Sequence, residues 1–171
     1  MKLLGVVLIV AATTSFGFYA AHLLSQRSKQ LRNIKLALKL FETEILYGHI
    51  PLNEAMKRIA NQVDKPISLI FNSFAIRLES NDEVDVTKCW ESSLKDIWPF
   101  TALKKQDYEI LRSFGNNIGL HDLITEQKNI SLTLSHLERE EREAHLIQQQ
   151  NERMFKVLGF LLGLLIILLL F

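Results

Sequence analysis

The feature that most constrains this chain is an uncharged run near its start, because Leu3–Leu24 contains no Asp, Glu, Lys or Arg over 22 residues. At a helical rise of about 1.5 Å per residue the run is about 33 Å long, enough to cross the hydrocarbon core of a bilayer. The alternative is a cleavable signal peptide, whose apolar region is about 7–15 residues long and follows basic residues. Only Lys2 precedes this run. We therefore predict a retained transmembrane helix over residues 1–24.

A second apolar run, Val157–Phe171, closes the sequence. It is shorter than the about 20 residues that a membrane span usually needs. Met154 and Phe155 extend it upstream, and Lys156 can direct its ammonium group to the interface. The extended segment is about 27 Å of helix, a mismatch that bilayers tolerate. A buried core helix is the alternative, but it would need a larger core than the rest of the chain supplies. We predict a second transmembrane helix over residues 154–171.

Basic residues predict how the chain is oriented in the membrane. Five Lys and Arg residues follow the first run before the first acid, Glu42, whereas Lys2 alone precedes that run. Arg153 and Lys156 stand on the same side of the second run. Because basic flanks stay in the cytoplasm, we predict a multi-pass cell-membrane protein with two spans. Residues 25–153 would be cytoplasmic, and both termini would lie outside.

The periodicity of apolar residues predicts helices throughout the segment between the two runs. Leucine, isoleucine and phenylalanine recur at steps of three and four as far as about Leu46, which predicts that the first span continues as one amphipathic helix. Turn residues and spacing predict four more helices: Leu52 to about Val63 opened by Pro51, Ile67–Leu78, about Val86 to Pro99, and one capped by Thr101 that carries Leu103, Tyr108, Leu111 and Phe114. The predicted fold class is therefore all-α, a cytoplasmic helical bundle between two transmembrane helices.

The last predicted helix is much longer than the others. No Pro follows Asp122, and no Gly follows it until Gly159, so one helix is predicted from Asp122 through Phe171 and into the membrane. Its nearly all-polar middle, EREEREAHLIQQQNER, is interpreted either as a solvated face or as a coiled-coil or docking surface. Gly159 and Gly163 form a small-residue pattern that permits close packing, either between the two spans or between two copies of the chain.

Motifs for catalysis or cofactor binding are absent from the sequence. It contains no phosphate-binding loop, no dinucleotide fingerprint and no HExxH. Cys89 is the single cysteine and has no nucleophile motif around it, and the acids form no obvious catalytic pair. The net charge of +1 does not indicate a nucleic-acid partner. We predict no cofactor, no metal and no enzymatic activity, and an uncharacterised membrane hydrolase is the least favoured alternative.

Two stretches, ETEILYGHIPLNEAMKRIA (Glu42 to Ala60) and FGNNIGLHDLITEQKNI (Phe114 to Ile130), resemble the stage III sporulation protein AB family of endospore-forming bacteria. The resemblance extends to the layout of the whole chain. Phe114 and Ile118 stand where the family often has Leu, which keeps the apolar character. The matched positions, which are the candidate structural or interaction residues, are Tyr47, Gly48, Pro51, Leu52, Glu54, Ala55, Gly115, Gly119, Asp122 and Gln127.

This resemblance implies a role in the channel complex between mother cell and forespore. The soluble part is similar to the cytoplasmic domains of the F-protein platform of type II secretion and type IV pilus machines, which couple an ATPase to the membrane. The implied partners are the companion secretion-type ATPase, the stage III sporulation AA protein, and other membrane proteins of the channel complex. The domain would then face the mother-cell cytoplasm. A scaffold that acts only through its spans and long helix is the alternative function, and the two motifs are interpreted either as architecture or as a partner-binding surface.

Overall fold

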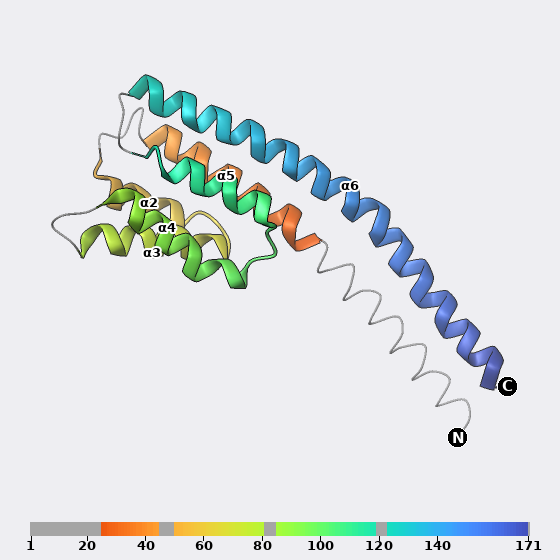
Figure 1. Ribbon diagram of the computed structural model, residues 1–171. Coiled ribbons are helices and arrows are strands. Elements are labelled where there is room, and N and C mark those ends of the chain that lie inside the picture. The colour runs from red at the N-terminus through yellow and green to blue at the C-terminus, as the bar shows by residue number, and fades with distance from the viewer. Residues whose placement is uncertain (1–24, 45–49, 81–84, 119–122, 171) are drawn as a thin grey trace. The chain divides into compact units, whose positions relative to one another are not determined.

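The computed structural model describes residues 25–44, 50–80, 85–118 and 123–170, and within these ranges all regular secondary structure is helical (Figure 1). The all-α prediction is therefore confirmed. The elements are a first helix over residues 25–43, α2 (Leu52–Ala60), α3 (Ile67–Glu79), α4 (Val86–Ile97), the short 3-10 helix η2 (Trp98–Phe100), α5 (Lys105–Gly115) and α6 (Leu123–Leu170).

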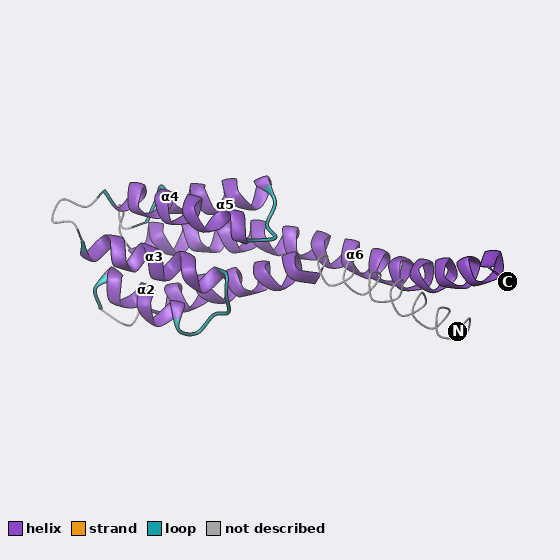
Figure 2. Ribbon diagram, turned by 90° about the horizontal axis from the view of Figure 1, so that it is seen from below, coloured by secondary structure: helices purple, strands orange, loops and turns teal. Residues whose placement is uncertain are grey.

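The chain divides into two compact units. The first combines Met1–Ser28 with Arg142–Phe171, and its described residues are helical. The second, Lys29–Glu141, is called the central domain below. In this domain α2 packs on α3, α3 on α4 and α4 on α5, so each of these four helices contacts the next one along the chain (Figure 2).

The core of the central domain is built around Trp90 of α4. Its ring is 1% exposed and makes edge-to-face contacts with Phe71, Phe74 and Phe114, with centroid separations of 5.7, 5.2 and 5.7 Å. The indole Nε1–H donates to the Leu111 carbonyl (2.8 Å). Buried aromatic rings supply large apolar area, and the hydrogen bond satisfies the one polar atom of this side chain. Trp90 thus joins α3, α4 and α5.

The predicted stripe on the first helix is confirmed where the structure describes it. Leu31, Ile34, Leu38 and Phe41 are each at most 1% exposed. Ile45 and the predicted end near Leu46 lie outside the described residues. The helix after Pro51 ends at Ala60 rather than near Val63, and its Ala55, Met56 and Ile59 are buried. The expected helices over Ile67–Leu78 and from Val86 to Pro99 are observed as α3 and α4, with η2 taking up the residues around Pro99.

The predicted cap of the fifth helix was wrong. Thr101 does not cap α5: its hydroxyl donates to the Trp98 carbonyl (2.8 Å), and α5 begins at Lys105. The cap is supplied by Asp107, whose Oδ2 accepts from the Lys104 backbone N–H (2.7 Å). Asp107 is fully buried. A carboxylate in the first turn both satisfies a free N–H group and interacts favourably with the helix dipole.

The long last helix is confirmed as α6, which spans Leu123–Leu170. The described part of the chain contains no helix long and apolar enough to cross a membrane. The predicted first span lies outside the described residues, and residues 154–171 coincide with the end of α6 apart from Phe171. Both spans stay predictions.

Within the central domain, α6 buries both apolar and polar residues. Ile130 and Leu137 are buried, and Leu134 is half-buried. Three polar residues are buried with them, namely Glu126, Thr133 and Glu140. They recur every seven residues, which places them on one helix face. The interpretation of the polar middle as a solvated face is therefore wrong at Glu140, which is 3% exposed.

Candidate functional site

The first motif forms the beginning of α2. Pro51 precedes this helix with φ −57° and ψ 144°, and its carbonyl accepts from the Ala55 backbone N–H (3.0 Å). Ala55 is buried, Leu52 is half-buried, and Glu54 is exposed in the first turn. This confirms that Pro51 opens the helix. Glu54 lies near the positive end of the helix dipole, where an acid is favourable. Tyr47 and Gly48 lie outside the described residues.

The second motif begins where α5 ends. Gly115 is the last residue of α5, and the Trp90 ring occupies the space that a side chain would need there. A β-carbon at this position would overlap the indole Cδ1 atom, so close helix packing requires glycine. Gly119 and Asp122 lie outside the described residues. Gln127 is exposed near the start of α6.

The fold brings the two motif stretches together. The Gln127 amide donates to Glu42 Oε1 across 3.4 Å, which joins the start of α6 to the end of the first helix. Arg58 of α2 pairs with Glu54 (2.8 Å) and lies 3.9 Å from Glu44. These contacts gather the first helix, α2 and α6 at one end of the central domain. We call this region the motif end and define it by Glu42, Pro51, Glu54, Ile124 and Gln127.

The motif end combines charge with exposed apolar surface. Ile124 is 78% exposed, more than any other large apolar side chain in the described part of the chain. Glu54 and its partner Arg58 are each half exposed. Charge complementarity and an exposed apolar anchor are the ingredients of a protein-binding surface. Neither motif shows a nucleophile beside a base, and the described residues contain no group of three metal-ligating side chains.

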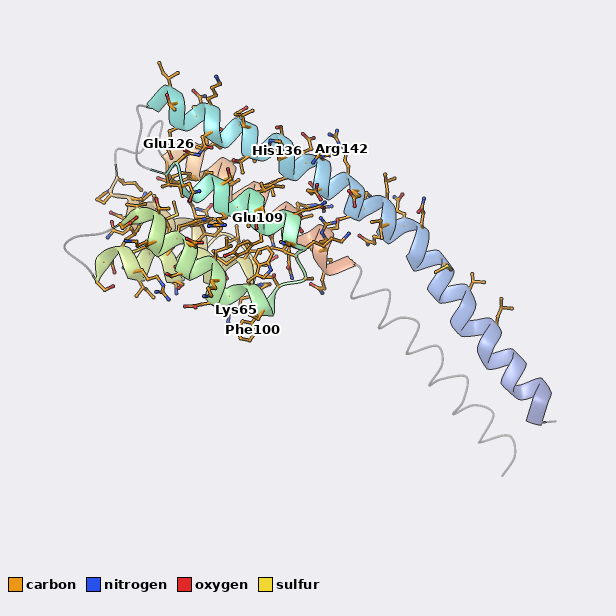
Figure 3. All side chains as sticks on the ribbon, in the orientation of Figure 1. Lys65, Phe100, Glu109, Glu126, His136 and Arg142 are labelled. Atoms are coloured by element: carbon orange, nitrogen blue, oxygen red, sulfur yellow. The ribbon has the colours of Figure 1, made fainter. Side chains whose placement is uncertain are left out.

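A groove of about 350 Å³ lies between α5 and α6. Figure 3 shows Glu109 on α5 and His136 on α6, two of the residues that line it. The complete lining is Lys105, Gln106, Glu109, Ile110, His136, Arg139 and Glu140. Both signs of charge alternate along this lining, so it does not favour a particular ion. The sequence analysis did not predict that Glu140, a buried acid, lines this groove. The seven-residue spacing of Glu126, Thr133 and Glu140 could have indicated it.

Glu141, the last residue of the central domain, holds α6 to the first helix. Its carboxylate pairs with Lys35 (2.8 Å) and Arg32 (3.3 Å), and its side chain is 17% exposed. Partial burial raises the pKa of Glu141, but the hydrogen bonds and charges of Lys35 and Arg32 outweigh that effect and hold the pKa below its ordinary value of 4.5. Because the folded state lowers this pKa, the pair contributes stability above about pH 4.5. That contribution is lost as the pH falls through the folded value.

We expect Glu141→Gln to lower the free energy of unfolding at pH 7 by about 1–2 kcal/mol, because the partly buried Lys35 and the exposed Arg32 lose a charged acceptor. The deficit should shrink at a pH well below 4.5, where the wild-type carboxylate with its lowered pKa also becomes protonated. Thermal unfolding of the full-length protein in detergent at both pH values measures this. Glu138→Gln, an exposed site on the same helix, is the control. An equal deficit at both pH values would rule out the ion pair as its cause.

Comparison with known proteins gives a consistent result along the whole chain. The family model for stage III sporulation protein AB matches residues 2–171. The stage III sporulation protein AB of Bacillus subtilis (strain 168) is 47% identical over 170 residues, covering 99% of each chain. A solved structure of stage III sporulation protein AB (SpoIIIAB) has a TM-score of 0.69 and 41% identity, and it covers 73% of this chain and 98% of its own. The chain belongs to the stage III sporulation protein AB family.

Proposed function

We propose that this sporulation-family protein is a non-enzymatic membrane platform in the channel complex between mother cell and forespore. In this proposal two spans anchor it in the cell membrane. The central domain then faces the mother-cell cytoplasm, where it recruits or couples a secretion-type ATPase, the companion AA protein, to the other membrane proteins of the complex. The family membership and the resemblance to secretion platforms support this proposal.

The observation that carries the proposal is the position of the motif end. Lys29, the first residue of the central domain, and Glu42, at the motif end, both lie on the first helix. They are 13 residues apart, which is about 20 Å along the helix. The last residue of the domain, Glu141, pairs with Arg32 and Lys35 near the start of that helix. We call the end that carries Lys29 and Glu141 the entry end. Both predicted spans connect to the entry end, whereas the motif end lies at the opposite end of the first helix. A cytoplasmic ATPase has free access to such a surface.

We expect Ile124→Glu and Glu54→Arg each to weaken ATPase binding about tenfold or more, since one buries a charge in an apolar contact and the other reverses a charge at the motif end. The measurement is the dissociation constant between full-length protein in nanodiscs and the purified ATPase. Leu132→Glu is the matched control, because Leu132 is an exposed apolar residue (54%) on the same helix, about 12 Å further along.

The competing function is a scaffold that acts only through its spans and long helix, with self-association through Gly159 and Gly163. It predicts that the wild-type protein does not bind the ATPase at all, and that exchanging both spans for unrelated apolar helices abolishes assembly. If the wild type binds the ATPase and Ile124→Glu, Glu54→Arg and Leu132→Glu all bind it equally well, the ATPase contacts another part of the domain. Loss of binding by Leu132→Glu alone would contradict the assignment to the motif end.

A further inference from the structure

An exposed aromatic corner stands at the entry end of the central domain. It consists of Trp98, Pro99 and Phe100, the residues of η2. Phe100 is 73% exposed, and Figure 3 shows its side chain projecting away from the neighbouring helices. A phenylalanine held in water in this way is unfavourable, because most of its apolar area stays solvated. The exposed Pro99 and the half-buried Trp98 extend this apolar surface, and contiguous apolar patches mark sites where proteins contact partners or membranes.

Phe100 is exposed because of how the fold holds the corner. The Trp98 ring packs edge to face on Tyr108, with centroids 4.9 Å apart. The Thr101 backbone N–H donates to the Trp98 carbonyl (3.0 Å), as the Thr101 hydroxyl also does. The Ala102 backbone N–H donates to Gln30 Oε1 (2.8 Å), and Gln30 is itself buried. These contacts fix the corner on the first helix, so the outward position of Phe100 is built into the domain.

Exposed cations outnumber exposed acids around the corner, because Asp96, two residues before Trp98, pairs with Arg77 of α3. Between Trp98 and Gln106 there are two lysines, Lys104 and Lys105, and no acid, and both lysines are exposed. The loop of residues 61–66 lies at the same end of the domain in Figures 1 and 2, and it carries the exposed Lys65. Its one acid, Asp64, accepts from the Asn33 amide (3.5 Å). Exposed aromatic rings beside lysines are typical of surfaces that contact lipid headgroups.

The chain places this surface near the proposed bilayer. Gln30, which holds the corner, is six residues after Leu24, the last residue of the predicted first span. Six residues of chain reach at most about 20 Å, and the headgroup layer on each side of the hydrocarbon core is about 5–8 Å thick. The short link therefore keeps the corner within reach of the headgroups.

We propose that the aromatic corner, with Lys104, Lys105 and Lys65, docks on the headgroup layer of an anionic bilayer. This inference rests on the two spans of the proposed function. The headgroups cover Phe100, and the lysines interact with anionic lipid. The contact fixes the orientation of the central domain on the membrane, so that the motif end points away from the lipid.

The test uses the full-length protein in phosphatidylcholine vesicles with or without phosphatidylglycerol. Cys89, the single cysteine, is replaced by serine, and a bimane fluorophore is attached at Phe100→Cys or, as control, at Ile124→Cys. The label at position 100 should be quenched by headgroup-nitroxide lipid and protected from aqueous iodide, whereas the label at position 124 should be quenched by iodide only. Reversing Lys104 and Lys105 to Glu should shift the docking equilibrium on anionic vesicles by roughly fivefold for each lost lysine.

ATPase binding, measured on the same vesicles carrying the label at position 100, separates this proposal from the proposed function. Iodide quenching at both positions in vesicle-bound protein would overturn the lipid contact and leave the ATPase platform intact. Lipid quenching at position 124 as well would overturn the assigned orientation. Protein that does not float with the vesicles would overturn the two spans and this inference together.

Discussion

Replacing Gly115 by alanine should lower the free energy of unfolding of the central domain by about 2–3 kcal/mol, because the added methyl group overlaps the Trp90 ring. Neither side can move away easily. Trp90 is enclosed by three phenylalanine rings and hydrogen-bonded to Leu111, in the same helix as Gly115. Relief of the overlap therefore requires α4 and α5 to separate. The usual benefit of alanine over glycine in a helix is smaller than this cost.

Calorimetric unfolding of the full-length protein in detergent measures the effect of Gly115→Ala. Gln106→Ala, at an exposed site in the first turn of the same helix, is the matched control and should change stability by less than about 0.5 kcal/mol. Wild-type stability of the Gly115→Ala variant would show that the two helices have room to adjust. The second motif would then need an explanation other than helix packing at this position.

The helices could be predicted from the sequence because their signals are local. The stripe through Leu31 and Phe41 and the proline before α2 act within a few residues, and the structure confirms both. The prediction of the α5 cap was wrong because a contact between distant residues overrides the local signal. Thr101 is a good capping residue by type, but the chain around it turns to form the contact between Ala102 and Gln30, 72 residues away. The helix can then begin only at Lys105, where Asp107 satisfies the free N–H group.

The candidate site depended on contacts that no local pattern contains. The sequence indicated that Gly115 matters, but the reason is Trp90, which lies on another helix. Likewise, Gln127 approaches Glu42, 85 residues away in the sequence, because the first helix and α6 pack antiparallel. Glu126 and Glu140 were missed because a search for apolar stripes discounts acids, whereas the domain buries both on the inner face of α6.

Trp90→Ala should lower the free energy of unfolding of the central domain by about 3–5 kcal/mol, the range for deleting a large buried aromatic side chain. The variant loses three ring contacts and one hydrogen bond. Without that bond, the Leu111 carbonyl no longer has its Trp90 donor. Trp98→Ala is the control, because Trp98 is only half-buried and contacts one ring, that of Tyr108. Equal losses from both variants would contradict the central position of Trp90.

Combining Trp90→Ala with Gly115→Ala tests whether the two residues act through the same contact. Without the indole ring, a β-carbon at position 115 no longer overlaps Trp90. Alanine should then stabilise the end of α5 by up to about 1 kcal/mol, the usual advantage over glycine in a helix. The effect of Gly115→Ala therefore changes sign between the two backgrounds, which is a coupling of about 2–4 kcal/mol. If Gly115→Ala destabilises the domain equally in both backgrounds, the glycine serves a different contact.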